Sequence, residues 1–155
     1  MVSKASLRRC RIVFLSFFCP LILTGCPGPG DRMRMDQTTL VELRGDNVCM
    51  SIRDSQDYQP VDMAINPRGT PSKEKKFDVA PALNLVDGRL CIPPSYYHFT
   101  SGKKYIVEFV LHSPSIDEPR SFVVAVGVSN DNKVYNFALT SREIARPYGS
   151  IEGSE

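Results

Sequence analysis

The sequence contains no tryptophan, and among its 155 residues it has only two histidines, His98 and His112. The lack of tryptophan excludes a core in which a tryptophan packs against a disulfide between two sheets. Two histidines leave few imidazole groups for acid–base catalysis, and neither stands near a nucleophile in a glycine-flanked elbow. We therefore interpret both histidines as surface or strand-edge residues and expect that the protein is not an enzyme.

The sequence also lacks the clusters of ligands that bind metal ions. Cys49 and Cys91 have no close cysteine or histidine neighbours, which a zinc site would need. Asp54, Asp57 and Asp62 miss the spacing of a calcium loop with its glycine and terminal glutamate, so we interpret them as loop carboxylates. We expect no metal and no cofactor.

Clustered basic residues and long apolar runs are missing as well. The 19 Lys and Arg residues and the 17 Asp and Glu residues give a formal net charge of only +2. Such a mixed, nearly neutral composition provides no basic patch that could bind nucleic acid. The apolar run at residues 12–23 is shorter than the about 20 residues that a membrane-spanning helix needs.

The amino-terminal segment has the order of a secretory signal. A basic start precedes the apolar run, which ends at residues 23–26 in the string LTGC. This string resembles the lipobox of bacterial lipoproteins, whose signal peptidase cuts before a cysteine that has received a diacylglycerol. The resemblance implies that residues 1–25 are a lipoprotein signal peptide and that Cys26 is lipidated. The alternatives are an ordinary signal peptide cut elsewhere and a cysteine that merely falls near the end of the run.

Lipidation of Cys26 would attach the protein to a lipid bilayer, because several acyl chains on one terminus anchor a protein stably. In enterobacterial lipoproteins an aspartate after the cysteine signals retention in the inner membrane, and here that residue is Pro27. We therefore expect a lipid-anchored protein of the periplasm, on the outer membrane rather than the inner membrane. All 17 acidic residues follow residue 25, whereas four of the 19 basic residues precede it, so cleavage lowers the formal net charge from +2 to −2.

The remaining chain is long enough for one domain with a hydrophobic core. Proline and glycine alternate directly after Cys26 and can neither continue a helix nor join a sheet, so we interpret residues 26–37 as a tether. We expect the folded domain over residues 38–148 and a flexible polar tail over residues 149–155.

Cysteine usage indicates an oxidising compartment. Cys10 and Cys19 leave with the signal and Cys26 is acylated, which leaves Cys49 and Cys91 as one pair. A disulfide between them would close a long loop and stabilise the fold by roughly 4 kcal/mol in the chain-entropy model. The alternative is two buried free thiols.

The mature chain reads as short strands separated by turns, with little helical periodicity. Hairpin turns are predicted at residues 44–47, 87–88 and 129–132, where Gly, Asn and Asp accept positive φ. The strands are expected at residues 38–43, 48–52, 61–65, 77–86, 89–92, 104–112, 121–128 and 133–139. In the segment 104–112, we expect Tyr105, Val107, Phe109 and Leu111 to face the core.

Seven or eight such strands without βαβ alternation predict an all-β fold, an antiparallel β-sandwich of immunoglobulin or fibronectin type III type. The run from Leu90 to Phe109 resembles the approach to the tyrosine-bearing strand of fibronectin type III domains. A small barrel is the alternative.

Two loops carry residues suited to recognition of a partner. The polar loop at residues 66–76 contains Arg68, and the loop at residues 93–99 concentrates Tyr96, Tyr97 and His98 after two prolines. Rigid amphipathic aromatics are favoured as interface anchors. The alternatives are a solvated connector for the first loop and burial beneath the sheet for the second.

Several stretches together resemble small enterobacterial lipoproteins described as type VI secretion immunity proteins of the periplasm. They are residues 23–33 (LTGCPGPGDRM), 57–71 (DYQPVDMAINPRGTP), 90–99 (LCIPPSYYHF), 105–109 (YIVEF) and 119–121 (PRS). The resemblance implies a protein that neutralises a toxin effector by stoichiometric binding, and it transfers no catalytic residues. A structural or assembly lipoprotein, which binds a component of an envelope or secretion machine, is the alternative.

Overall fold

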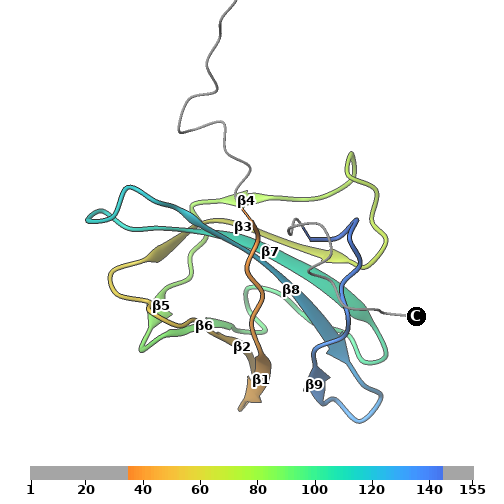
Figure 1. Ribbon diagram of the computed structural model, residues 1–155. Helices are drawn as coiled ribbons and strands as arrows, with labels where there is room; N and C mark the ends of the chain where they lie inside the picture. Colours follow the sequence, from red (N-terminus) through yellow and green to blue (C-terminus); the bar gives the residue numbers. More distant parts are fainter. Residues whose placement is uncertain (1–34, 145–155) are drawn as a thin grey trace, which may run out of the picture. The chain divides into compact units, whose positions relative to one another are not determined.

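The computed structural model describes residues 35–144, which form nine antiparallel strands in two packed sheets (Figure 1). The four-stranded sheet has the order β1-β2-β6-β5, and the five-stranded sheet has the order β4-β3-β7-β8-β9. The strands are β1 (Val41–Arg44), β2 (Asn47–Ser51), β3 (Gln59–Pro67), β4 (Asp78–Val79), β5 (Leu85–Val86), β6 (Arg89–Ile92), β7 (Lys104–His112), β8 (Arg120–Val128) and β9 (Val134–Tyr135). The predicted all-β sandwich is confirmed.

The strand order is that of an immunoglobulin-like domain. The first sheet corresponds to strands A, B, E and D, and β3, β7 and β8 correspond to C, F and G of the second sheet. The short strand β4 extends the second sheet at one edge and β9 extends it at the other. Nine strands are present in this part of the chain rather than seven or eight, because the segment expected as one strand at residues 77–86 forms two short strands, β4 and β5.

The core lies between the two sheets, and β7 contributes four buried side chains to it. Tyr105, Val107, Phe109 and Leu111 are all at most 4% exposed, as the alternation predicts. Phe109 stacks on Phe122 of β8 with a distance of 4.9 Å between ring centroids. Burial of large apolar side chains in such a core is the main favourable contribution to the free energy of folding.

All three predicted hairpin turns are present. The turn between β5 and β6 is the clearest, because both of its central residues have positive φ, 49° at Asp87 and 70° at Gly88. Two positive φ values define the turn type that matches the twist of antiparallel strands. The other two turns join β1 to β2 and β8 to β9.

The segment expected as one strand at residues 77–86 differs from the prediction. Ala80 has a φ of 56° and is followed by Pro81, and this pair interrupts the extended backbone. The residues before the break form β4 and pair with β3, whereas those after it form β5 and pair with β6. The segment therefore crosses from one sheet to the other.

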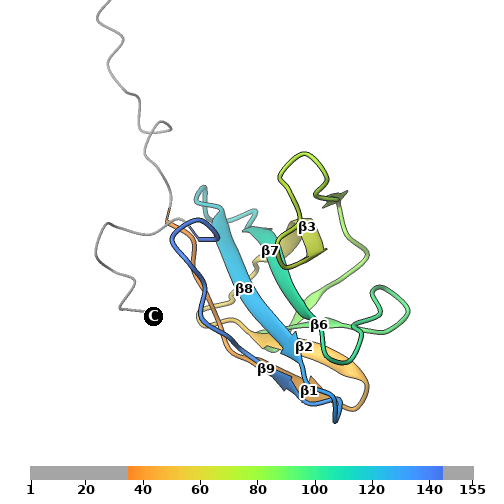
Figure 2. The ribbon, with the colours of Figure 1, turned by 90° about the vertical axis from the view of Figure 1, so that its right-hand side faces the viewer.

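The segment expected as a strand at residues 133–139 leaves the sheet after Tyr135. It then lies over the outer face of the five-stranded sheet, where Phe137, Leu139 and Ile144 pack against Ile106 and Val123. These contacts bury apolar side chains on a face that the strand alternation would otherwise expose. We call residues 136–144 the covering segment; it is dark blue in Figure 2.

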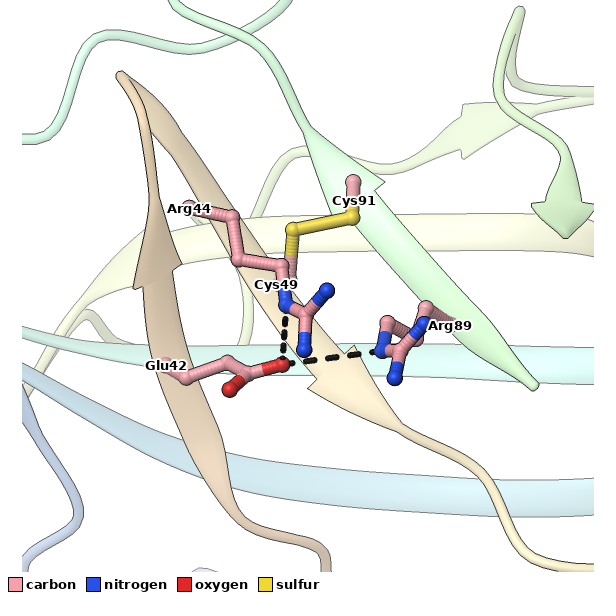
Figure 3. The surroundings of a disulfide bond; sticks show 5 residues. All are labelled: Glu42, Arg44, Cys49, Arg89 and Cys91. Atoms are coloured by element: carbon pink, nitrogen blue, oxygen red, sulfur yellow. Dashed lines mark hydrogen bonds and ion pairs between the residues drawn. A yellow bond between two sulfur atoms is a disulfide. The ribbon is translucent and has the colours of Figure 1, made fainter. Parts of the chain in front are cut away.

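The predicted disulfide between Cys49 and Cys91 is confirmed, which excludes two free thiols. The two residues are direct partners on neighbouring strands of one sheet, with a Cα–Cα distance of 4.0 Å. The bridge therefore differs from that of antibody domains, which joins the two sheets. Glu42 lies beside the bridge (Figure 3). Its Oε1 atom is 2.6 Å from Nε of Arg44 and 3.7 Å from Nε of Arg89.

At the amino-terminal side the described chain joins the sheet before β1. The backbone N–H of Gln37 donates to Ser121 O, and Gln37 O accepts from Val123 N–H, both at 2.8 Å. The predicted signal peptide, the predicted lipidation site Cys26, most of the predicted tether and the predicted tail at residues 149–155 lie outside the described residues. Among residues 35–144 no helix is long and apolar enough to cross a membrane.

Candidate binding site at one end of the sandwich

Three connections meet at one end of the sandwich and enclose a hollow of about 340 Å³, which we call the end hollow. They are the β1–β2 turn, the loop between β6 and β7, and the β8–β9 turn. The residues that line it are Leu43, Asp46, Val48, Pro94, Tyr97, His98, Phe99, Val128, Asn132 and Val134. Its walls are mostly apolar and aromatic, and the polar side chains of Asp46, His98 and Asn132 supply hydrogen-bonding groups.

Aromatic rings make the wall of the end hollow rigid. Tyr97 lies edge-on to Phe99 and to Tyr105, with centroid distances of 4.9 and 5.7 Å. Phe99 and Tyr105 complete the triangle at 5.1 Å. Such edge-to-face pairs stabilise by about 0.5–1.5 kcal/mol each beyond the area they bury. Burial raises the pKa of the Tyr97 hydroxyl, so this group stays protonated.

Hydrogen bonds hold the β6–β7 loop in place beneath these rings. The backbone N–H of Thr100 donates to the Tyr105 hydroxyl at 3.0 Å, which is the tyrosine corner of immunoglobulin-like folds. Pro93 O accepts from the N–H groups of Tyr96 and Tyr97 at 2.9 and 3.1 Å. The loop that carries the aromatics is therefore pinned at both ends.

The neighbouring β8–β9 turn is tied to the same loop. The Ser129 hydroxyl donates to Lys133 O at 3.0 Å and accepts from Lys133 N–H at 3.0 Å, which closes the turn. A hydrogen bond between the side chains of Ser101 and Asn132 then connects the turn to the loop before β7. The end hollow is thus bounded by segments that are fixed relative to one another.

The structure brings together two of the four residues proposed for partner binding. Tyr97 and His98 both line the end hollow, and His98 is exposed. Tyr96 lies instead towards the edge strand β4, where its hydroxyl donates to Asp78 Oδ2 at 2.5 Å. Burial, together with the Asp78 carboxylate, raises the pKa of Tyr96 above its usual value.

Arg68, the fourth residue, does not line the end hollow. Its Nε and Nη2 atoms donate to the two carboxylate oxygens of Glu143 at 2.7 and 2.9 Å, and its guanidinium lies 4.6 Å from the ring centroid of Phe137. The hydrogen bond from Arg68 is the largest cause that lowers the pKa of Glu143, to about 2. Arg68 thereby fastens the covering segment to the end of β3.

Sequence reasoning missed the residues that the two hairpin turns contribute to the end hollow, Leu43, Asp46 and Asn132. The turns themselves were predicted from their Gly, Asn and Asp residues. Their meeting point depends on strand pairing between residues far apart in the chain, so no local signal could identify it.

The described residues contain no group of three or more His, Cys, Asp or Glu side chains placed to hold a metal ion. Within the same range, both histidines are exposed, and Asp57 accepts from the hydroxyls of Ser113 and Ser115. These hydrogen bonds lower the pKa of Asp57 and join the β2–β3 loop to the β7–β8 loop. Asp57 therefore holds these two loops together.

The fold and the end hollow define a disulfide-bonded, immunoglobulin-like β-sandwich domain with an aromatic surface at one end. The chain belongs to the family described as domain of unknown function DUF7480, which matches residues 36–131. The match ends within the β8–β9 turn, so β9 and the covering segment lie beyond it. No curated protein matches the chain, and no solved structure matches it.

Proposed function

We propose that this protein is a lipid-anchored binding protein of the periplasm that neutralises a type VI secretion toxin by binding it in equal stoichiometry. One observation carries the proposal: three connections form a rigid hollow with half-buried aromatic rings and exposed polar groups at one end of the sandwich. The lipobox at residues 23–26 and the resemblance of the mature chain to periplasmic immunity lipoproteins support the location and the type of partner.

The end hollow has the physical properties of an interface hot spot. Tyr97 and Phe99 are held by ring contacts, so little side-chain entropy is lost when a partner covers them. A projecting side chain of the toxin would fill the hollow, while Asp46 and His98 would select it by hydrogen bonds at the rim. Leu43 is 45% exposed and would be covered in the complex.

Anchoring is tested separately from binding. Acylation of Cys26 predicts that the mature protein begins at this residue and carries the mass of its acyl chains. Mass spectrometry of the exported protein measures this directly, and fractionation of the envelope assigns the membrane. In the Cys26→Ser variant we expect neither acylation nor cleavage at this position, and a start elsewhere in the wild-type protein would refute the anchor.

Binding is tested by a pull-down with the exported protein against the proteins of its own strain and of close competitors. Recovery of one secreted toxin in equal stoichiometry is the expected result. Recovery of envelope-machine components alone would instead assign the protein to the assembly lipoproteins.

Two exposed positions test whether the end hollow is the interface. His98→Asp and Leu43→Asp place a carboxylate on its rim without changing the core, and each should weaken toxin binding at least about tenfold. His112→Asp is the matched control, because His112 is exposed and does not line the end hollow. Affinities equal to the wild type in both rim variants would place the interface elsewhere.

A further inference from the structure

The first described residues and the covering segment run side by side in Figure 2, and a second and larger hollow lies between them. We call it the side groove; its volume is about 650 Å³. Its apolar lining comes from Leu40, Phe122, Phe137, Leu139 and Ile144. A volume in this range is typical of sites that hold a small molecule.

The polar lining of the side groove is positively charged. It includes Arg53 and Arg120, and no acidic side chain is among its described lining residues. The lining therefore combines an apolar wall with two positively charged side chains, a combination that attracts an amphipathic anion.

Arg120 is held in place by neutral oxygens. Its Nη1 donates to Arg53 O at 2.9 Å and to Asp54 O at 3.1 Å, and its Nη2 donates to Gln37 Oε1 at 2.8 Å. The guanidinium also lies 5.4 and 5.2 Å from the ring centroids of Tyr58 and Phe122. None of these contacts cancels its charge, so the guanidinium is pre-positioned and remains attractive to an anion.

The side groove lies where the chain enters the domain. Gln37, which lines it, follows Cys26 by 11 positions, and this length of chain reaches at most about 35–40 Å when fully extended. Two exposed apolar side chains are close by in sequence, Met35 at 44% and Leu40 at 75% exposure. Exposed apolar residues next to arginines are typical of surfaces that contact anionic lipid headgroups.

We infer that the side groove binds an anionic phospholipid of the membrane to which the protein is anchored. Arg53 and Arg120 would hold the phosphate, and the apolar lining from Leu40 to Ile144 would take part of the acyl chain. The choice of a membrane lipid as the source of this anion depends on the proposed anchor at Cys26, whereas the preference for an amphipathic anion depends only on the groove.

The test uses the protein as exported by the cell, purified in a neutral detergent. Short-chain phosphatidylglycerol is titrated in, and the unfolding temperature is measured; short-chain phosphatidylcholine and inorganic phosphate serve as the comparison ligands. A ligand that binds the folded state alone raises the unfolding temperature. We expect a rise with phosphatidylglycerol that salt reduces, and little change with either comparison ligand.

Substitutions in the side groove distinguish a site from general attraction to lipid. Arg53→Glu and Leu40→Ser should each weaken phosphatidylglycerol binding at least about tenfold, since both residues are exposed and neither change disturbs the core. Lys73→Glu makes the same change of charge at an exposed residue outside the groove and should bind as the wild type does.

Equal responses to the two phospholipids, or phosphatidylglycerol binding that survives both groove substitutions, would overturn the inference. Mass spectrometry of the same preparation reports acylation of Cys26 independently. Failure of the groove and failure of the anchor are therefore distinguishable.

Discussion

A single side chain, that of Asn136, connects its own segment to β8 and to residues 39–41, which lie more than 90 positions earlier in the sequence. Its Oδ1 accepts from Val41 N–H at 2.9 Å, and its Nδ2 donates to Thr39 O and to Ala125 O, both at 3.1 Å. It therefore replaces the main-chain hydrogen bonds that would be missing at this edge of the sheet, because β9 has ended one residue earlier.

Removing this side chain should leave three backbone groups without their partner. We expect Asn136→Ala to lower the free energy of unfolding by about 1–3 kcal/mol, measured by urea denaturation. Asn136→Asp should be at least as destabilising, because a carboxylate would face the carbonyl oxygens of Thr39 and Ala125. Asn84→Ala is the control at an exposed asparagine and should stay within about 0.5 kcal/mol of the wild type. A similar loss in both alanine variants would contradict the role of Asn136.

At the scale of elements, the strands that could be predicted are those with complete local signals. The strand β7 begins and ends where its alternation predicts, and β6 matches its expected range, because every second residue along both strands is buried in the core. The segment at residues 77–86 was harder to predict. Its apolar residues suggest one continuous strand, but Ala80 and Pro81 interrupt the extended backbone. Only the pairing partners show that its two halves belong to different sheets.

The candidate site was predictable to a smaller extent. The sequence identified Tyr97 and His98 from the concentration of aromatics after two prolines, and these residues do share the end hollow. It gave no indication that Arg68 would form an ion pair with Glu143, 75 positions later in the sequence. Contacts of this range are decided by how the covering segment packs, which no local pattern encodes.

The pairing of β8 with β9 contains a close contact between a glycine and an aromatic ring. Tyr135 is the direct partner of Gly127, and a Cβ added at Gly127 would lie 2.3 Å from Tyr135 Cζ. We expect Gly127→Ala to cost about 1 kcal/mol of stability, because the ring has to move away. In the Tyr135→Ala background the same change should be neutral or stabilising, since glycine in a strand costs about 0.5–1 kcal/mol relative to alanine. Equal effects in the two backgrounds, measured as a double-mutant cycle, would show that the ring does not occupy this space.

The attachment of the covering segment should depend on pH. The pKa of Glu143 is lowered from 4.5 to about 2, so its pairing with Arg68 stabilises the folded state above pH 4.5 and is lost as the pH falls towards 2. The stability difference between the wild type and Glu143→Gln should therefore be largest near neutral pH and shrink as the pH approaches 2. Urea denaturation across this range checks the trend. A difference that stays constant with pH would contradict it.

At the scale of the whole molecule, the disulfide joins parts of the chain that are 42 positions apart, although it lies within one sheet. We expect the Cys49→Ala/Cys91→Ala double variant to lose about 4 kcal/mol of stability, as the loop length predicts. Adding reductant should reduce the stability of the wild type by a similar amount and leave the double variant unchanged. No loss in the double variant would show that strand pairing alone holds β2 and β6 together.

The bridge of Gln37 to Phe122 fixes the point at which the chain enters the domain. The chain enters at the beginning of β8, whereas Val128, at the other end of the same strand, lines the end hollow. Six residue steps of a strand separate these positions by about 20 Å. The point where the chain enters the domain and the end hollow therefore lie at opposite ends of β8, so that under the proposed anchor at Cys26 a partner could reach the hollow without competing with the entering chain.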